Sequence, residues 1–375
     1  HRQRRLHGTT AHIDHIQSGS YVTNRVLRYG KVRTYASPVF FTILLFESGW
    51  QLPIPFHFQR IAGEIVMALD PQVQVVLENM KRQGVPPLHA LSVDKARQID
   101  LSAMAAQPEE VWRVESRNIP GQTDLIPVRI YTPRSEAPMP VIVYYHGGGW
   151  VVGNLDSADV LCRQLANGVN GIVVSVDYRL APEHKFPAAV EDAYAAAVWA
   201  AQNADSLGAD PNRVSVAGDS AGGNLATVVA MMARDRGAPS IRYQMLVNPV
   251  THYSFDTQSY KDNGEGFGLT TETMRWFWGH YLSNEQDGRH PYASPLLAAD
   301  LSGLPPTLLL TAEFDPLRDE GEAYGEKLRA AGVRVEMKRY EGMVHGFILQ
   351  TGAYDQGKKA VLHAVSALRQ ALSEE

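Results

Sequence analysis

The sequence is poor in cysteine, in excess charge and in long apolar runs. Its single cysteine, Cys162, excludes an internal disulfide, and the helical pattern of Val160–Leu165 around it indicates a core residue rather than a nucleophile. A formal net charge of −5 gives no reason to expect nucleic-acid binding. The apolar run Val39–Phe46 has only eight residues, whereas a membrane span needs about 20. We therefore predict a cytoplasmic protein with no stable membrane insertion and no nucleic-acid partner.

Residues 1–66 differ in composition from the rest of the chain. Their first 46 residues carry seven basic residues and one acid, Asp14. A basic region before an apolar run is typical of a signal peptide, but this run starts late and no A-x-A cleavage site directly follows it. We therefore interpret residues 1–66 as an atypical leader, either non-native or translated from an upstream start, with the natural start near Met67. His12 and His15 flank Asp14, but no further ligand pattern lies nearby, so no metal site is predicted.

Beyond the leader, strands alternate with helices. A chain of 375 residues with 45% apolar and 20% charged residues can bury a large core. The alternation predicts an α/β fold, in which helices flank a mostly parallel, eight-stranded sheet on both faces. The predicted strands are 111–118 and 125–132, which pair antiparallel, then 140–145, 172–176, 213–217, 243–247, 307–311 and 333–339. The predicted helices of this part are 157–167, 187–203, 224–233 and 355–372.

Two segments are predicted to cover the sheet as a helical cap. Asp70 and Pro71 form a typical helix N-cap and first-turn pair, and apolar residues recur at helical spacing after them. A second helix is predicted over Val93–Ala106. The aromatic-rich stretch 250–290 breaks the alternation, so we interpret it as an excursion that helps these helices to roof the site. The predicted boundaries are 1–66 for the leader, 67–110 for the cap helices and 111–375 for the catalytic domain.

A strand, a tight turn and a helix surround Ser220. Gly218-Asp-Ser-Ala-Gly222 matches G-x-S-x-G, and in this context the motif exposes a serine nucleophile. The turn holds Ser220 in a strained conformation, and side chains two residues to either side would collide, so both glycines are required. The helix N-terminus also leaves backbone N–H groups free beside the serine. The pentapeptide alone leaves an ordinary glycine-rich turn as the alternative.

A second glycine-rich turn, His146-Gly-Gly-Gly-Trp150, follows the predicted strand 140–145. Three glycines leave backbone N–H groups unobstructed. Such groups can form an oxyanion hole, in which donors face the charge that develops on a carbonyl oxygen. This turn is the usual partner of the G-x-S-x-G turn. The two motifs together favour a nucleophilic role for Ser220.

A nucleophilic serine needs a base, and the base needs an orienting acid. Asp315 follows a predicted strand, at a position from which its carboxylate would face the site. Asp319 and Glu320 are interpreted as acids at the start of a helix, although either stays open as the orienting acid. His345 lies shortly after the last predicted strand in a glycine-flanked loop, and the other histidines are interpreted as surface or structural residues. The chain order Ser220, Asp315, His345 is the order of nucleophile, acid and base that accompanies these motifs.

On these residues the sequence resembles the hormone-sensitive-lipase-like branch of the α/β-hydrolases, the bacterial family IV carboxylesterases. The resemblance covers roughly Met67–Glu375 and includes the GDSAG form of the serine motif. It implies the α/β-hydrolase fold with an N-terminal helical cap. The matching segments are His146–Trp150, Asp177–Glu183, Phe186–Ala188, Gly218–Gly223, Asp315–Glu320 and His345–Phe347.

The resemblance implies a serine carboxylesterase with Ser220 as nucleophile, His345 as base and Asp315 as orienting acid. An acyl-enzyme intermediate, no metal, no cofactor and a possible homodimer are implied with it. A capped site predicts a small-molecule ester with an acyl chain on the order of two to eight carbons. The backbone N–H groups implied for the oxyanion hole are those of Gly148, Gly149 and Ala221, with Gly147 adjacent.

Two other functions stay open. An amidase or peptidase uses the same three side chains, so the sequence alone does not separate it from an esterase. Some relatives on this branch resemble the plant gibberellin receptor, which keeps the serine but lacks the histidine. The presence of His345 argues against such a non-catalytic receptor.

Overall fold

The computed structural model describes residues 33–36, 42–45, 58–61 and 64–373. The chain divides into two compact units, residues 1–57 and 58–375. In the first unit, strands β1 (Arg33–Ala36) and β2 (Thr42–Leu45) pair antiparallel. Most of the predicted leader, including His12 and His15, lies outside the described residues.

The second unit begins with a short hairpin. Its strands β3 (Phe58–Ile61) and β4 (Glu64–Met67) pair antiparallel. These two strands lie at the boundary between the predicted leader, 1–66, and the predicted cap segment, 67–110.

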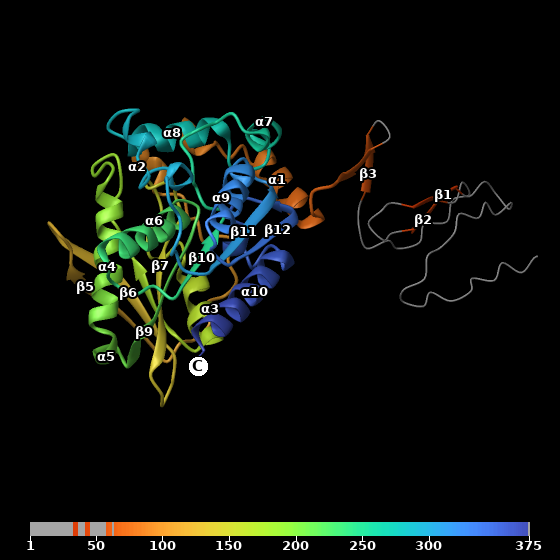
Figure 1. The fold of residues 1–375 in the computed structure, drawn as a ribbon. Helices are drawn as coiled ribbons and strands as arrows, with labels where there is room; N and C mark the ends of the chain where they lie inside the picture. Colours follow the sequence, from red (N-terminus) through yellow and green to blue (C-terminus); the bar gives the residue numbers. More distant parts are fainter. Residues whose placement is uncertain (1–32, 37–41, 46–57, 62–63, 374–375) are drawn as a thin grey trace, which may run out of the picture. The chain divides into compact units, whose positions relative to one another are not determined.

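An eight-stranded sheet forms the centre of the second unit (Figure 1), in the order β12-β11-β10-β9-β7-β8-β6-β5. It is parallel except at β6, which runs antiparallel to both of its neighbours. This arrangement confirms the predicted fold class. The strands are β5 (Arg113–Pro120), β6 (Leu125–Thr132), β7 (Met139–Tyr145), β8 (Ile172–Val176), β9 (Ala209–Asp219), β10 (Tyr243–Val247), β11 (Thr307–Phe314) and β12 (Val335–Val344).

The helices that cover the sheet belong to two hydrophobic clusters, one on each face of the sheet. The larger cluster includes α4, α6 and α9, and the other includes α3 and α10. Strand β7 contributes Val141 and Val143 to the first cluster but Ile142 and Tyr144 to the second, because successive side chains of a strand point to opposite faces. Both faces are therefore buried. The helices are α3 (Asp159–Val169), α4 (Ala188–Gln202), α6 (Ala221–Arg236), α9 (Arg318–Ala330) and α10 (Asp355–Leu372).

The first of the two predicted cap helices is present, and the second is much shorter than predicted. Helix α1 (Pro71–Arg82) begins at the N-cap Asp70, whose side chain accepts from the Gln72 N–H at 2.8 Å. The prediction of one helix over Val93–Ala106 is wrong, because α2 ends at Ala96. Asp100 accepts hydrogen bonds from both the N–H and the hydroxyl of Ser102. Such a local turn competes with a continuing helix.

The excursion between β10 and β11 contains α7 (Gln258–Asn263) and α8 (Thr271–Tyr281). Figure 1 shows α8 at the same end of the unit as α2 (Val93–Ala96). His89 contacts Thr273 of α8, with 2.9 Å between Nδ1 and Oγ1. The segment before β5 and the excursion are therefore hydrogen-bonded to each other.

Arg97 ties the segment after α2 to the loops around the sheet. Its Nε donates to the Val151 carbonyl at 2.9 Å, and its Nη2 donates to the Ala181 carbonyl at the same distance. The two terminal nitrogens also bind both oxygens of Glu183, at 2.8 and 2.7 Å. Paired contacts of this kind fix the geometry of a guanidinium group more firmly than one contact does. The predicted cap segment is thus attached beside the glycine-rich loop that follows β7.

Candidate active site

Four predicted site segments follow the carboxyl ends of sheet strands. His146 directly follows β7, Ser220 follows β9, Asp315 follows β11 and His345 follows β12. The four strands are parallel and neighbours in the sheet or separated by one strand. In such sheets ligands bind at the carboxyl ends of the strands. The fold therefore brings residues from four distant parts of the sequence to one edge.

Ser220, His345 and Asp315 form a continuous hydrogen-bonded chain. The Nε2 atom of His345 lies 2.9 Å from the Ser220 hydroxyl oxygen, and its Nδ1 atom lies 2.8 Å from Oδ2 of Asp315. Asp315 is fully buried, whereas Ser220 is 8% exposed. A hydroxyl, an imidazole and a carboxylate in this order are the arrangement in which a serine can be activated as a nucleophile.

The turn at Ser220 has the strained geometry that the motif predicts. Ser220 has φ 55° and ψ −120°, a combination that L-residues rarely adopt. Its N–H donates to the Val247 carbonyl at 2.8 Å, which holds the turn against β10. A Cβ atom on Gly218 would lie 2.3 Å from the Gly222 carbonyl oxygen, and one on Gly222 would lie 1.9 Å from that of Tyr145. Both glycines are therefore required by close approach of the backbone.

The tight packing at Gly222 predicts that a larger residue there destabilises the fold. Gly222→Ala is expected to lower the free energy of unfolding by about 3 kcal/mol, because its methyl group would meet backbone atoms that have no room to move. Gly279→Ala is the control, since the space around Gly279 in α8 is open. Urea unfolding of both variants measures the difference. Equal stability of Gly222→Ala and the wild type would contradict the packing argument.

The environment of Asp315 fixes its carboxylate. The Leu317 N–H donates to Oδ1 at 2.9 Å, and the side-chain amide of Asn248 donates to Oδ2 at 2.8 Å. Oδ2 is also the oxygen that contacts His345. Asn248 carries no motif that the sequence could reveal. The signal it did carry was its place directly after β10, at the same edge of the sheet as the other site residues.

The two alternative acids make other contacts. Asp319 accepts from the Ser259 N–H at 2.7 Å, and Oε1 of Glu320 accepts from the N–H groups of Thr251 and His252. Burial raises the pKa of Glu320 to about 8, although the two backbone donors oppose that rise. Both acids lie in the first turn of α9, as their interpretation as helix-start acids predicts.

The charge balance at His345 depends on two carboxylates. Burial disfavours the protonated imidazole, but the Asp315 carboxylate and, more weakly, that of Asp219 outweigh it. The pKa of His345 therefore lies above its ordinary value. The imidazolium that would form on taking a proton from Ser220 is thus stabilised by the groups around it.

In the glycine-rich loop after β7, Gly147 differs from the two glycines that follow it. The Gly147 N–H donates to Oδ1 of Asp219 at 3.1 Å, so it is engaged and does not face an oxyanion. Asp219 is itself held by the Tyr144 hydroxyl at 2.6 Å. Within residues 64–373, the N–H groups of three predicted donors have no protein acceptor. These three are Gly148, Gly149 and Ala221.

His146 supports this loop and is not placed to react. Its ring is fully buried, stacks on Tyr178 at 4.4 Å between ring centroids, and has Nδ1 2.7 Å from the Gly147 carbonyl oxygen. Burial lowers the pKa of His146 to about 4, although the contact with the Gly147 carbonyl opposes the shift. The ring is therefore neutral at physiological pH and donates a hydrogen bond that holds the loop.

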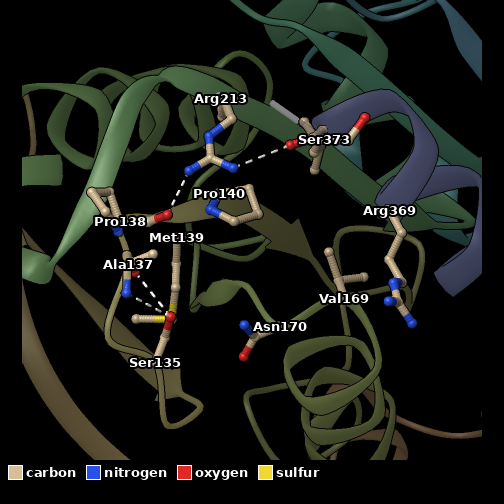
Figure 2. Close-up of a pocket in the computed structure, with 11 residues that line it drawn as sticks. Ser135, Ala137, Pro138, Met139, Pro140, Val169, Asn170, Arg213, Arg369 and Ser373 are labelled. Carbon is tan, nitrogen blue, oxygen red and sulfur yellow. Dashed lines mark hydrogen bonds between the residues drawn. The ribbon is translucent and has the colours of Figure 1, made fainter. Parts of the chain in front are cut away.

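A separate hollow of about 300 Å³ lies away from these residues. Figure 2 shows that Met139 and Pro140, at the start of β7, line it together with Arg213 and Arg369. It contains none of the predicted site residues and adjoins the amino ends of strands. The hydrogen-bonded groups that can carry out chemistry meet at the opposite, carboxyl edge, and we place the candidate site there.

The described residues show neither a cluster of metal ligands nor a helix suited to a membrane. Among residues 64–373 and the three short strands before them, no three His, Cys, Asp or Glu side chains are grouped so as to hold a metal ion. In the same residues, no helix combines the length and apolar character that crossing a bilayer requires.

Known proteins resemble this chain in sequence over most of its length. The residue pattern of the α/β-hydrolase fold matches residues 142–349, a range that includes all four strand ends of the site. The chain belongs to the α/β-hydrolase family. This α/β-hydrolase is 43% identical over 335 residues to the carboxylic ester hydrolase LipN of Mycobacterium tuberculosis, covering 85% of the chain and 89% of LipN.

Two further relatives agree with this assignment. An ethyl acetate hydrolase from Pseudomonas putida is 37% identical, with 82% of this chain and 100% of the relative covered. The crystal structure of a thermostable esterase from Pseudomonas putida superposes with a TM-score of 0.80 at 40% identity, covering 82% of this chain and 99% of that one. This α/β-hydrolase is therefore a carboxylic ester hydrolase of the hormone-sensitive-lipase-like branch.

Proposed function

We propose that the chain hydrolyses short to medium acyl-chain esters through Ser220, His345 and Asp315. The observation that carries the proposal is the hydrogen-bonded chain of these three side chains, with 2.9 and 2.8 Å between the bonded atoms. Asp315 holds the imidazole with its proton on Nδ1, so Nε2 is free to accept the Ser220 proton. From the GDSAG form of the turn at Ser220 we also infer membership of the corresponding subgroup of this branch.

The reaction proceeds in two acyl transfers. The Ser220 oxygen forms a bond to the ester carbonyl carbon while its proton moves to His345 Nε2. The tetrahedral intermediate then breaks its bond to the alkoxy oxygen, which leaves as an alcohol with that proton. A water molecule attacks the acyl-enzyme with the same base, and the acid product leaves with Ser220 restored.

The oxyanion of each intermediate is bound by backbone N–H groups. Those of Gly148, Gly149 and Ala221 support this role because they have no protein acceptor among the described residues 64–373. Both glycines have positive φ, 118° and 58°. A Cβ on Gly149 would lie 2.1 Å from the Phe277 ring, so this loop requires glycine.

The roof above this loop supports a restricted acyl chain. Phe277 of α8 is buried against Gly149, and Trp150 stacks on Tyr281 with 4.1 Å between ring centroids. Aromatic side chains of the excursion thus close the space beside the proposed oxyanion donors. One relative carries the name ethyl acetate hydrolase, which is consistent with a small acyl group.

A panel of p-nitrophenyl esters tests the substrate class. We expect kcat/KM to be highest for acyl chains of about two to eight carbons and to fall for longer chains, because the closed roof limits the pocket. The matching p-nitroanilides are expected to react far more slowly. Faster hydrolysis of long-chain emulsified triglycerides would contradict the proposed chain length, and faster hydrolysis of the anilides would favour the amidase.

Three further points stay predictions. The segment 67–110 is proposed to act as a cap together with 250–290, which the contacts of Arg97 and His89 support. A homodimer and a cytoplasmic location are proposed from the resemblance and the composition. The receptor alternative lacks support, since His345 is in contact with both of its partners.

A further inference from the structure

We propose that Asn248 is a positioning residue for ester hydrolysis, whose side-chain amide holds Oδ2 of Asp315 toward His345. This inference rests on the proposed function, in which His345 is the base and Asp315 its orienting acid. The contact that motivates it is the 2.8 Å hydrogen bond from Asn248 Nδ2 to Asp315 Oδ2. The same oxygen lies 2.8 Å from His345 Nδ1.

Asn248 is itself firmly placed. It directly follows β10, and its N–H donates to the Leu310 carbonyl of β11 at 2.7 Å. Its φ of 44° lies in the left-handed region, which asparagine and glycine tolerate better than other residues. Its side chain is 2% exposed, so a substrate has no direct contact with it. The side-chain amide can therefore affect turnover through Asp315, the residue to which it donates.

Asp315 needs these donors because it is fully buried. An ionised carboxylate in such a place is stable only when its oxygens accept hydrogen bonds. The Leu317 N–H holds Oδ1, and the Asn248 amide holds Oδ2. With one donor on each oxygen, the plane of the carboxylate is fixed independently of His345. His345 then meets an acceptor whose direction is already set.

Loss of the Asn248 amide leaves Oδ2 with His345 alone. The carboxylate can then turn about its own bond to Cβ, and the imidazole turns with it. Fewer molecules hold Nε2 in line with the Ser220 hydroxyl, so the chemical step slows. Substrate binding is unaffected, because the proposed oxyanion donors and the roof lie elsewhere.

Asn248→Gly tests the amide without straining the backbone, since glycine adopts positive φ readily. We expect kcat to fall about tenfold to a hundredfold, the range that loss of a hydrogen bond to a charged group produces. KM for p-nitrophenyl acetate is expected to stay within about threefold of the wild type. A kcat within twofold of the wild type in folded Asn248→Gly overturns the proposal, as does a loss confined to KM.

Asn248→Ala separates the effect of the amide from the effect of the backbone. Both variants remove the amide that donates to Asp315, but only alanine keeps the restriction on φ that a Cβ atom imposes. We therefore expect the same fall in kcat in Asn248→Ala as in Asn248→Gly, with KM within about threefold of the wild type. A kcat that falls in Asn248→Gly but stays within twofold of the wild type in folded Asn248→Ala overturns the proposal.

Gln244→Leu is the matched control. Gln244 is a fully buried amide on β10, donating to the Thr307 hydroxyl at 2.8 Å, away from Asp315. Its loss is expected to lower the melting temperature but not kcat. If Asn248→Gly does not fold, a kcat of Asn248→Ala within twofold of the wild type overturns the proposal.

Ser220→Ala in the same assay distinguishes a failure of the proposed function from a failure of the role proposed for Asn248. If that variant turns over esters as the wild type does, the proposed function fails. If it is inactive while Asn248→Gly is normal, only the role of Asn248 is wrong.

Discussion

Ser220→Ala is expected to lower kcat by a factor of about 10⁴ to 10⁶ while the protein stays folded. The substitution removes only the Oγ atom that lies 2.9 Å from His345 Nε2. Alanine keeps the Cβ atom, so the turn at φ 55° gains no new contact. The residual rate would come from substrate binding and the backbone donors, which stay in place. Initial rates with p-nitrophenyl acetate measure the loss.

Ser215→Ala is the matched control for this experiment. Ser215 is a fully buried serine on β9, and its hydroxyl donates to the Val141 carbonyl at 3.1 Å. Its loss is expected to leave kcat unchanged. In the wild type, an organophosphonate should modify Ser220 alone, as mass spectrometry of peptides can show. Modification of another serine, or near-normal turnover by Ser220→Ala, would refute the nucleophile assignment.

His345→Ala is expected to lose a factor on the order of thousands in kcat, because the group that contacts the Ser220 hydroxyl and would take its proton is removed. Asp315→Asn should lose a similar or somewhat smaller factor. His363→Ala is the control, since His363 also contacts an acid, Glu336, but lies on α10. A wild-type rate in His345→Ala would exclude it as the base.

The dependence of kcat/KM on pH follows from the charges around His345. The base must be neutral, so activity falls as pH drops through its pKa. That pKa is raised, because Asp315 and Asp219 favour the imidazolium more than burial disfavours it. The acid limb of the wild type is therefore expected above about 6.5, the ordinary value for histidine. Removal of the Asp315 charge in Asp315→Asn should move the limb of the remaining activity to lower pH. A limb that stays in place would show that another group controls it.

Most of the fold could be predicted because its signals are local. The strands of the sheet are short apolar runs, and β7, β8 and β10 are buried at every position, which is why they lack polar alternation. Helix α6 begins at Ala221, ahead of the predicted residue 224, because the turn after Ser220 is tight enough for Gly222 and Gly223 to be helical. The prediction of a helix over 93–106 is wrong for a local reason too. The hydrogen bonds of the turn at Asp100 compete with the helix that the apolar spacing favours.

The contacts of the buried carboxylates could not be predicted in this way. Gly147 lies in a loop whose glycines look alike in sequence, yet its N–H donates to Asp219, a residue 72 positions later. Glu320 is a helix-start acid in sequence but binds the backbone of the excursion at Thr251 and His252. Neither contact leaves a periodic or motif signal, because each joins groups from separate elements.

The strands of the sheet and the residues of the motifs could be predicted from the chain alone. The signals that predict them lie in the residue order itself. They are the periodicity of apolar residues, the glycines beside Ser220, and the chain order of Asp315 and His345. Which donors meet at Asp315 depends instead on how the strands pack. Asn248 lies 67 residues before Asp315, and the two come together because β10 and β11 are paired in the sheet. A hydrogen bond depends on a distance of about 3 Å, and the packing of the whole sheet sets that distance.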